Sequence, residues 1–137
     1  MAFADSGVRT IVNSGKGSTP PKITLAGACK VGDVLGYSSG WKPALATAGS
    51  VIQGRLVALR DGAVGDEIPV SPCPVVDGYT GGTPGNPVYV AEGANSGCIT
   101  ETIPDTASDA TTQVGMMLSA TQCQFNVGGR ADSVVSG

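Results

Sequence analysis

A chain of 137 residues is long enough to bury one apolar core and is short for two domains. Its 21 glycines and 9 prolines disfavour long helices and favour short strands joined by turns. There is no histidine, and the four cysteines form no C-x-x-C pair, which excludes the usual zinc-binding frameworks. We therefore predict an all-β protein, a small β-sandwich or a partly closed β-barrel, with no metal and no cofactor.

The charge of the chain is low and unevenly distributed. Charged residues make up 14% of the sequence, against about 25% in a typical soluble domain. Seven basic and two acidic side chains lie in residues 1–60, whereas one basic and nine acidic side chains lie in residues 61–137. This asymmetry can orient a protein on an acidic surface or pair its own subunits, unless the fold interleaves the two halves. No basic cluster contains aromatic residues, so we expect no nucleic-acid partner.

The N-terminal residues differ from the rest of the chain. A short apolar segment from Val8 to Val12 is followed by the Gly/Ser/Pro-rich stretch "NSGKGSTPPK". We interpret residues 1–22 as an extended N-terminal arm and linker, and residues 23–137 as a single compact β domain. A strand in such an arm gains most by adding to a sheet edge, either its own or that of a neighbour. The N-terminus lacks the features of a signal peptide and no apolar run reaches membrane-spanning length, so we expect synthesis in a reducing cytoplasm and no membrane partner.

The body contains short strand-like runs separated by Gly, Asn and Asp turns. In chain order they are "KITLAGA", "GDVLGYS", "GRLVALR", "DEIPVSP", "NPVYVAE", "GCITETI", "TQVGMML" and "TQCQFNV". Eight such runs within about a hundred residues are typical of a sandwich or barrel.

The residues that could carry chemistry form no catalytic pattern. "SGKGST" lacks the earlier glycine of a phosphate-binding loop, and the adjacent Asp66 and Glu67 alternate across a strand, so they cannot flank one substrate. Without histidine, a Ser or Cys nucleophile lacks its usual base. The cysteines lie in apolar, strand-like segments, and in a reducing cytoplasm we expect buried thiols. We predict that the protein is not an enzyme and has no catalytic residues.

The order of features from Gly32 to Val127 resembles the capsid cement, or head-decoration, proteins of tailed bacteriophages. By pattern the resemblance covers about seventy per cent of the chain. The four cysteines and the C-terminal "GGRADSVVSG" depart from it. The segments that carry it are "GDVLGYSSGWKPAL", "AVGDEIPVSP", "GTPGNPVYVAEGANSGCITE" and "TQVGMMLSATQCQFNV".

The resemblance implies a non-enzymatic protein on the outer surface of the virion that binds the major capsid protein and bridges neighbouring capsid subunits. It also implies self-association, as a homotrimer or a dimer. On this hypothesis the arm adds as a strand to a capsid edge, and Trp41 and Tyr89 are candidate subunit contacts. The predicted capsid contacts in the arm are Val8, Arg9, Ile11, Val12 and Lys16.

A second hypothesis belongs to another class of protein. A β-rich accessory module of a phage tail or fibre would bind a glycan or a small ligand, with Trp41 and Tyr79 as the binding aromatics. Aromatic residues make up 4% of the chain, which disfavours such a site. A third hypothesis, a hydrolase, lacks a general base.

Overall fold

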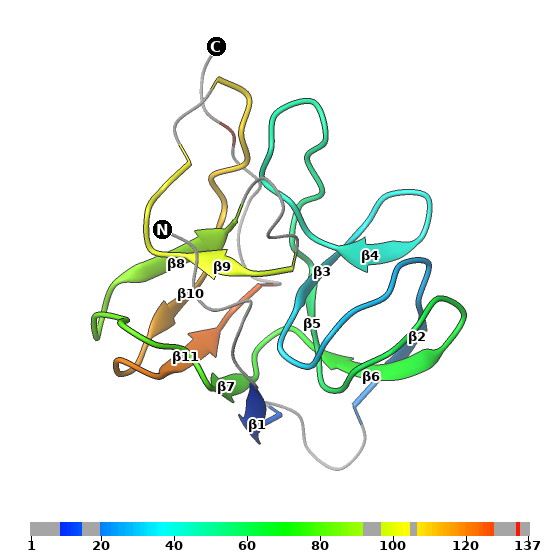
Figure 1. The fold of residues 1–137 in the computed structure, drawn as a ribbon, viewed down its shortest axis with the longest axis horizontal. Coiled ribbons are helices and arrows are strands. Elements are labelled where there is room, and N and C mark those ends of the chain that lie inside the picture. The colour runs from blue at the N-terminus through cyan, green and yellow to red at the C-terminus, as the bar shows by residue number, and fades with distance from the viewer. Residues whose placement is uncertain (1–8, 15–19, 92–96, 105–106, 128–133, 135–137) are drawn as a thin grey trace.

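The computed structural model describes residues 9–14, 20–91, 97–104, 107–127 and 134. Within these ranges the chain contains no helix and forms two antiparallel sheets and no closed barrel, which confirms the all-β prediction and is consistent with a small β-sandwich (Figure 1). In Figure 1 the six-stranded sheet lies on the left and the five-stranded sheet on the right.

The six-stranded sheet has the strand order β1-β7-β11-β10-β8-β9. Its strands are β1 (Thr10–Asn13), β7 (Val75–Asp77), β8 (Pro87–Val90), β9 (Ile99–Thr100), β10 (Gln113–Met117) and β11 (Gln122–Phe125). The five-stranded sheet has the order β2-β6-β5-β3-β4. Its strands are β2 (Lys22–Thr24), β3 (Val34–Tyr37), β4 (Trp41–Pro43), β5 (Leu56–Ala58) and β6 (Glu67–Ser71).

The strand-like runs of the body agree with this arrangement. Each of the eight predicted runs contains one strand of the structure. The body has two further strands: β4 is the second strand of "GDVLGYSSGWKPAL", a segment interpreted from the sequence as strand, turn and strand, whereas β7 is absent from the predicted runs. Both are three residues long, and each has a proline within it or directly before it, which weakens the alternating pattern by which strands are recognised.

The larger core lies between the two sheets. Phe125, Met117 and Val88 of the six-stranded sheet pack together with Val34 and Val57 of the five-stranded sheet, and each of these side chains is at most 1% exposed. The burial of this contiguous apolar cluster is the main source of stability in a domain of this size.

The sheets approach each other closely near Gly54. A Cβ atom at Gly54 would lie 2.7 Å from a methyl group of Val34 and 3.3 Å from a methyl group of Val114 in the facing sheet. A larger residue at this position would force Val34, and to a lesser extent Val114, to shift.

The five-stranded sheet encloses a second, smaller core. Its buried members are Leu25, Cys29, Leu35, Ala58, Ile68 and Val70. The two edges of the sheet meet at a parallel bridge between Leu25 and Trp41, where the Trp41 carbonyl accepts hydrogen bonds from the N–H groups of Ala26 and Gly27. The sheet therefore curls around this core.

Candidate functional site

The N-terminal arm contributes the edge strand β1 of the six-stranded sheet. Thr10 pairs with Asp77 and Ile11 with Val76 in an antiparallel register, and the register shifts between Ile11 and Asn13. Ile11 packs against the larger core, whereas the side chain of Val12 is 55% exposed. The arm strand is therefore paired with a sheet of its own chain, and no strand among the described residues pairs with its other edge.

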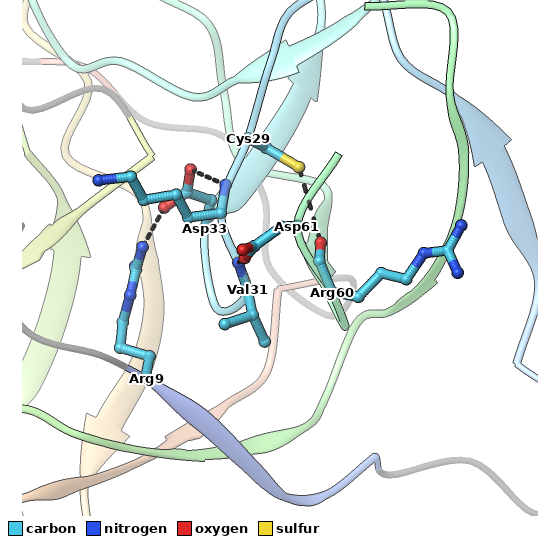
Figure 2. A network of polar contacts seen from close by, with 7 residues as sticks. Arg9, Cys29, Val31, Asp33, Arg60 and Asp61 are labelled. Carbon is cyan, nitrogen blue, oxygen red and sulfur yellow. Dashed lines mark hydrogen bonds and ion pairs between the residues drawn. The ribbon is translucent and has the colours of Figure 1, made fainter. Parts of the chain in front are cut away.

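Arg9, directly before β1, anchors this strand to the body. Its guanidinium group donates a hydrogen bond to the carboxylate of Asp33, and the side chains of this ion pair are 3% and 8% exposed (Figure 2). Burial by itself lowers the pKa of Arg9, but the charge of Asp33, the hydrogen bond to Asp33 and smaller contributions from nearby groups together outweigh burial, so the net pKa is raised. Arg9 is thus held as a buried cation by a carboxylate 24 positions along the chain.

The loop that carries Asp33 is itself held in place by several polar contacts. The second oxygen of the Asp33 carboxylate accepts a hydrogen bond of 3.0 Å from the Lys30 N–H, and Asp61 accepts one of 2.7 Å from the Val31 N–H (Figure 2). Gly97 lies against the carboxylate, since a Cβ atom there would be 2.7 Å from the Asp33 Cγ. These contacts therefore fix the position of the Asp33 carboxylate to which Arg9 binds.

The four sheet edges differ in how they are protected against pairing with other strands. The β9 edge is two residues long and both residues are buried. The β2 edge begins at Lys22 after two prolines, and β4 contains Lys42 and Pro43. Charged residues and prolines are the usual protection of an edge. By contrast, β1 has the sequence Thr-Ile-Val-Asn, and its register shift is the one protecting feature among its described residues.

The remaining residues predicted as contacts are dispersed. Val8 and Lys16 lie outside the described residues. Tyr89 is half-buried on β8, and Trp41 is half-buried on β4 against the smaller core. Tyr79, the second aromatic of the ligand-binding hypothesis, is 2% exposed within the larger core, so it cannot form an exposed platform with Trp41.

An aromatic pair that sequence reasoning missed occupies the β3–β4 hairpin. Tyr37 is 66% exposed and meets Trp41 edge to face, with 5.4 Å between the ring centroids. The two residues are paired across the hairpin, whose turn holds Ser39 and Gly40 at positive φ. The "YSSGW" turn, with an aromatic residue on each side, was the sequence signal that could have identified this pair.

The described residues contain no group of three or more His, Cys, Asp or Glu side chains placed to hold a metal ion. The four cysteines are not joined in disulfides. Burial raises the pKa of Cys123 to about 12 and is the main cause that raises the pKa of Cys29 to about 11. Both thiols are therefore poor nucleophiles at neutral pH.

Comparisons with protein-family models, curated proteins and solved structures found no match to this chain. In the described part of the chain, no helix is long and apolar enough to cross a membrane.

Proposed function

We propose that this protein decorates the outer surface of a phage head and stabilises it by bridging neighbouring major capsid subunits. The observation that carries the proposal is the exposed, uncharged edge of β1, which is held rigidly on the body by Arg9 and Ile11. The resemblance of the residues from Gly32 to Val127 to capsid cement proteins supports the same function. No catalytic role is part of the proposal.

The proposed contact is strand addition. An extended segment of the major capsid protein pairs with the outer edge of β1 through backbone hydrogen bonds, and Val12 packs against its side chains. Arg9 and Ile11, predicted as capsid contacts, serve in this arrangement to fix β1 rather than to touch the capsid. Val8 and Lys16 stay predicted contacts of the same arm.

A four-residue strand gives a weak contact by itself. On a shell, many copies and several arms of one oligomer engage at once, and avidity raises the overall affinity by about two to four orders of magnitude. Because backbone pairing depends little on side-chain identity, the same edge can serve at several quasi-equivalent positions on a head.

The test uses a charge placed at the proposed contact. A lysine at an exposed edge position opposes strand addition, so Val12→Lys is expected to weaken binding to purified undecorated heads by about tenfold or more. Val64→Lys is the matched control, since Val64 is 68% exposed in the turn between β5 and β6. Binding is measured by co-sedimentation with heads. Full occupancy by Val12→Lys would refute strand addition at β1.

Deletion of the N-terminal arm provides a second, independent test. Deleting residues 2–17 should abolish head binding, but it also removes Ile11 from the core and leaves Asp33 buried without its cation. The truncated protein therefore carries Asp33→Asn, and its folding is verified by circular dichroism. Retained decoration by this folded variant would contradict the proposal.

A second candidate function is supported by the Tyr37–Trp41 pair. Tyr37 is exposed next to Trp41, and the neighbouring turn residues Ser38 and Ser39 are exposed as well, a combination of aromatic and polar residues that suits binding of a sugar ring. Tyr37→Ala is preferred to a Trp41 variant because Trp41 also packs on the smaller core. Titration with soluble oligosaccharides, followed by the fluorescence of the chain's one tryptophan, tests this function. No response in the wild-type protein, or an equal response in Tyr37→Ala, would reject it.

A further inference from the structure

The side chain of Arg9 lies in a narrow slot between two segments of the body. A Cβ atom at Gly32 would be 3.2 Å from the Arg9 Cδ and 3.1 Å from a methyl group of Val76, so a larger residue there would narrow the space that holds the aliphatic part of the arginine. The guanidinium group reaches the Asp33 carboxylate at the end of this space (Figure 2). We call it the arginine slot and define it by Gly32, Asp33 and Val76.

The backbone of the arginine slot is fixed by hydrogen bonds that do not involve the arm. The Gly32 N–H donates to the Ala58 carbonyl at 2.8 Å, and the Asp33 carbonyl accepts a 2.9 Å bond from the Ala58 N–H. The Lys30 N–H donates a 3.0 Å bond to the Asp33 carboxylate. The slot therefore presents a buried carboxylate to any segment that fills it, and a segment without a cation would leave that charge unpaired.

The edge of β7 continues the arginine slot as a template for an extended segment. Arg9 directly precedes β1, and Ile11, two residues further on, lies opposite Val76 and packs against the larger core. Residues two positions apart on an extended segment point to the same side. The site therefore suits a segment that carries an arginine two residues before an apolar residue.

The chain's own arm fits this site imperfectly. The register of β1 on β7 shifts between Ile11 and Asn13, so that Val12 lies opposite no residue of β7. An extra residue of this kind locally disrupts the ladder of backbone hydrogen bonds. A segment without the extra residue would pair with the three residues of β7 in a regular register.

We propose that the arginine slot and the β7 edge bind an extended segment of a partner protein, which carries an arginine two residues before Ile or Val and takes the place of the arm. Every copy of this chain carries the same bulged strand, so the arm of a second copy fits no better than the chain's own. A partner segment in regular register gains the hydrogen bonds that the bulge forfeits, and this difference in affinity drives the exchange.

This site is distinct from the proposed capsid contact, which uses the opposite edge of β1. Its test therefore uses full-length protein and peptides without heads. Arg9→Ala empties the arginine slot, and fluorescence anisotropy measures the binding of labelled peptides. The reference peptide, GVRTIVNS, has the sequence of residues 7–14, and the regular peptide, GVRTINS, lacks the counterpart of Val12. We expect the regular peptide to bind about threefold or more tightly, as one or two regained hydrogen bonds allow.

A neutral isostere of arginine tests the role of the charge. Citrulline in place of the arginine of the regular peptide should weaken binding to Arg9→Ala at least about tenfold, because the buried Asp33 carboxylate then lacks a cation. In a protein with both Arg9→Ala and Asp33→Asn, the arginine and citrulline peptides should bind with similar affinity. This double variant is the matched control.

The wild-type protein tests the exchange itself. It should bind the regular peptide more weakly than Arg9→Ala does, because the peptide competes with an arm tethered to the same chain. The citrulline peptide should again bind less tightly than the arginine peptide. Should Arg9→Ala fail to fold, the wild-type protein alone decides between the outcomes.

Four results would overturn the proposal. They are no binding of the regular peptide to folded Arg9→Ala at about 1 mM, no binding to the wild-type protein at the same concentration, and equal binding of the arginine and citrulline peptides. The fourth is equal or tighter binding of the reference peptide, which would make the chain's own arm, from the same or a second copy, the better ligand. Arginine-dependent binding of the regular peptide, in preference to the reference peptide, supports the proposal.

Discussion

The buried ion pair between Arg9 and Asp33 predicts a large and specific loss of stability when one partner is removed. In Arg9→Met the aliphatic part of the side chain is largely kept, but the Asp33 carboxylate stays buried with its charge unpaired. Removing one member of a buried pair costs about 3–5 kcal/mol, most of it from the isolated charge that remains.

For Arg9→Met, the structure indicates a loss of stability at the lower end of this range of about 3–5 kcal/mol. The Asp33 carboxylate keeps its hydrogen bond from the Lys30 N–H, and its side chain has 8% exposure, which allows some access of water. We therefore expect Arg9→Met to lower the free energy of unfolding by about 3 kcal/mol. For a chain of this length that corresponds to a fall in Tm of about 10 °C.

A double-mutant cycle isolates the electrostatic part of the loss. Asp33→Asn removes the charge that Arg9→Met leaves unpaired, so the double variant should be more stable than the sum of the single losses predicts, by about 1–3 kcal/mol. Urea denaturation gives the free energies, and hydrogen exchange at the Ile11 amide reports whether β1 stays docked. If Arg9→Met costs less than about 0.5 kcal/mol, or if the two losses add, the pair does not anchor the arm.

Three further predictions concern other parts of the fold. Gly97→Ala should cost about 2 kcal/mol in thermal unfolding, because Gly97 has a φ of 83° and its Cβ would strike the Asp33 carboxylate. Asp109→Ala should lower stability in urea by about 1–3 kcal/mol, since the buried Asp109 carboxylate accepts a 2.8 Å hydrogen bond from the Ala48 N–H. Burial raises the pKa of the Cys123 thiol in the folded protein to about 12, against an ordinary value of 9.0. The protonated thiol therefore contributes its full stability below about pH 9, and this contribution is lost progressively as the pH rises toward about 12. Cys123→Ala should therefore flatten the alkaline decline of stability measured in urea between about pH 8 and 11.

Two strands of the body, β8 and β11, could be predicted because their residues alternate strictly between buried and half-buried. In "PVYV" the two valines are buried and Pro87 and Tyr89 are half-buried, and "TQCQF" repeats the pattern with Cys123 and Phe125 inside. A period of two is a property of the backbone, so it can be read without any knowledge of the partners. The sequence was therefore sufficient for the fold class.

The anchor of the arm could not be predicted in the same way. Arg9 and Asp33 are 24 positions apart and belong to segments with no shared pattern, so their pairing depends on the way the two sheets pack. The sequence indicated a charged side chain on an extended arm, and solvent exposure was the natural expectation. The Tyr37–Trp41 pair, by contrast, is a local contact across the β3–β4 hairpin, so the sequence of that turn could have identified it.

The anchor also determines how a partner strand would meet the arm. Fixing the backbone of the four residues of β1 costs about 4–8 kcal/mol of conformational entropy. Pairing of β1 with β7 and the ion pair with Asp33 offset this loss of entropy within the chain. A capsid segment that adds to β1 therefore pairs with a strand that is already ordered. Arg9→Met should then weaken head binding although Arg9 does not touch the capsid in this arrangement. If the freed arm instead bound heads as tightly as the wild-type protein, the arm itself rather than the docked edge would be the contact.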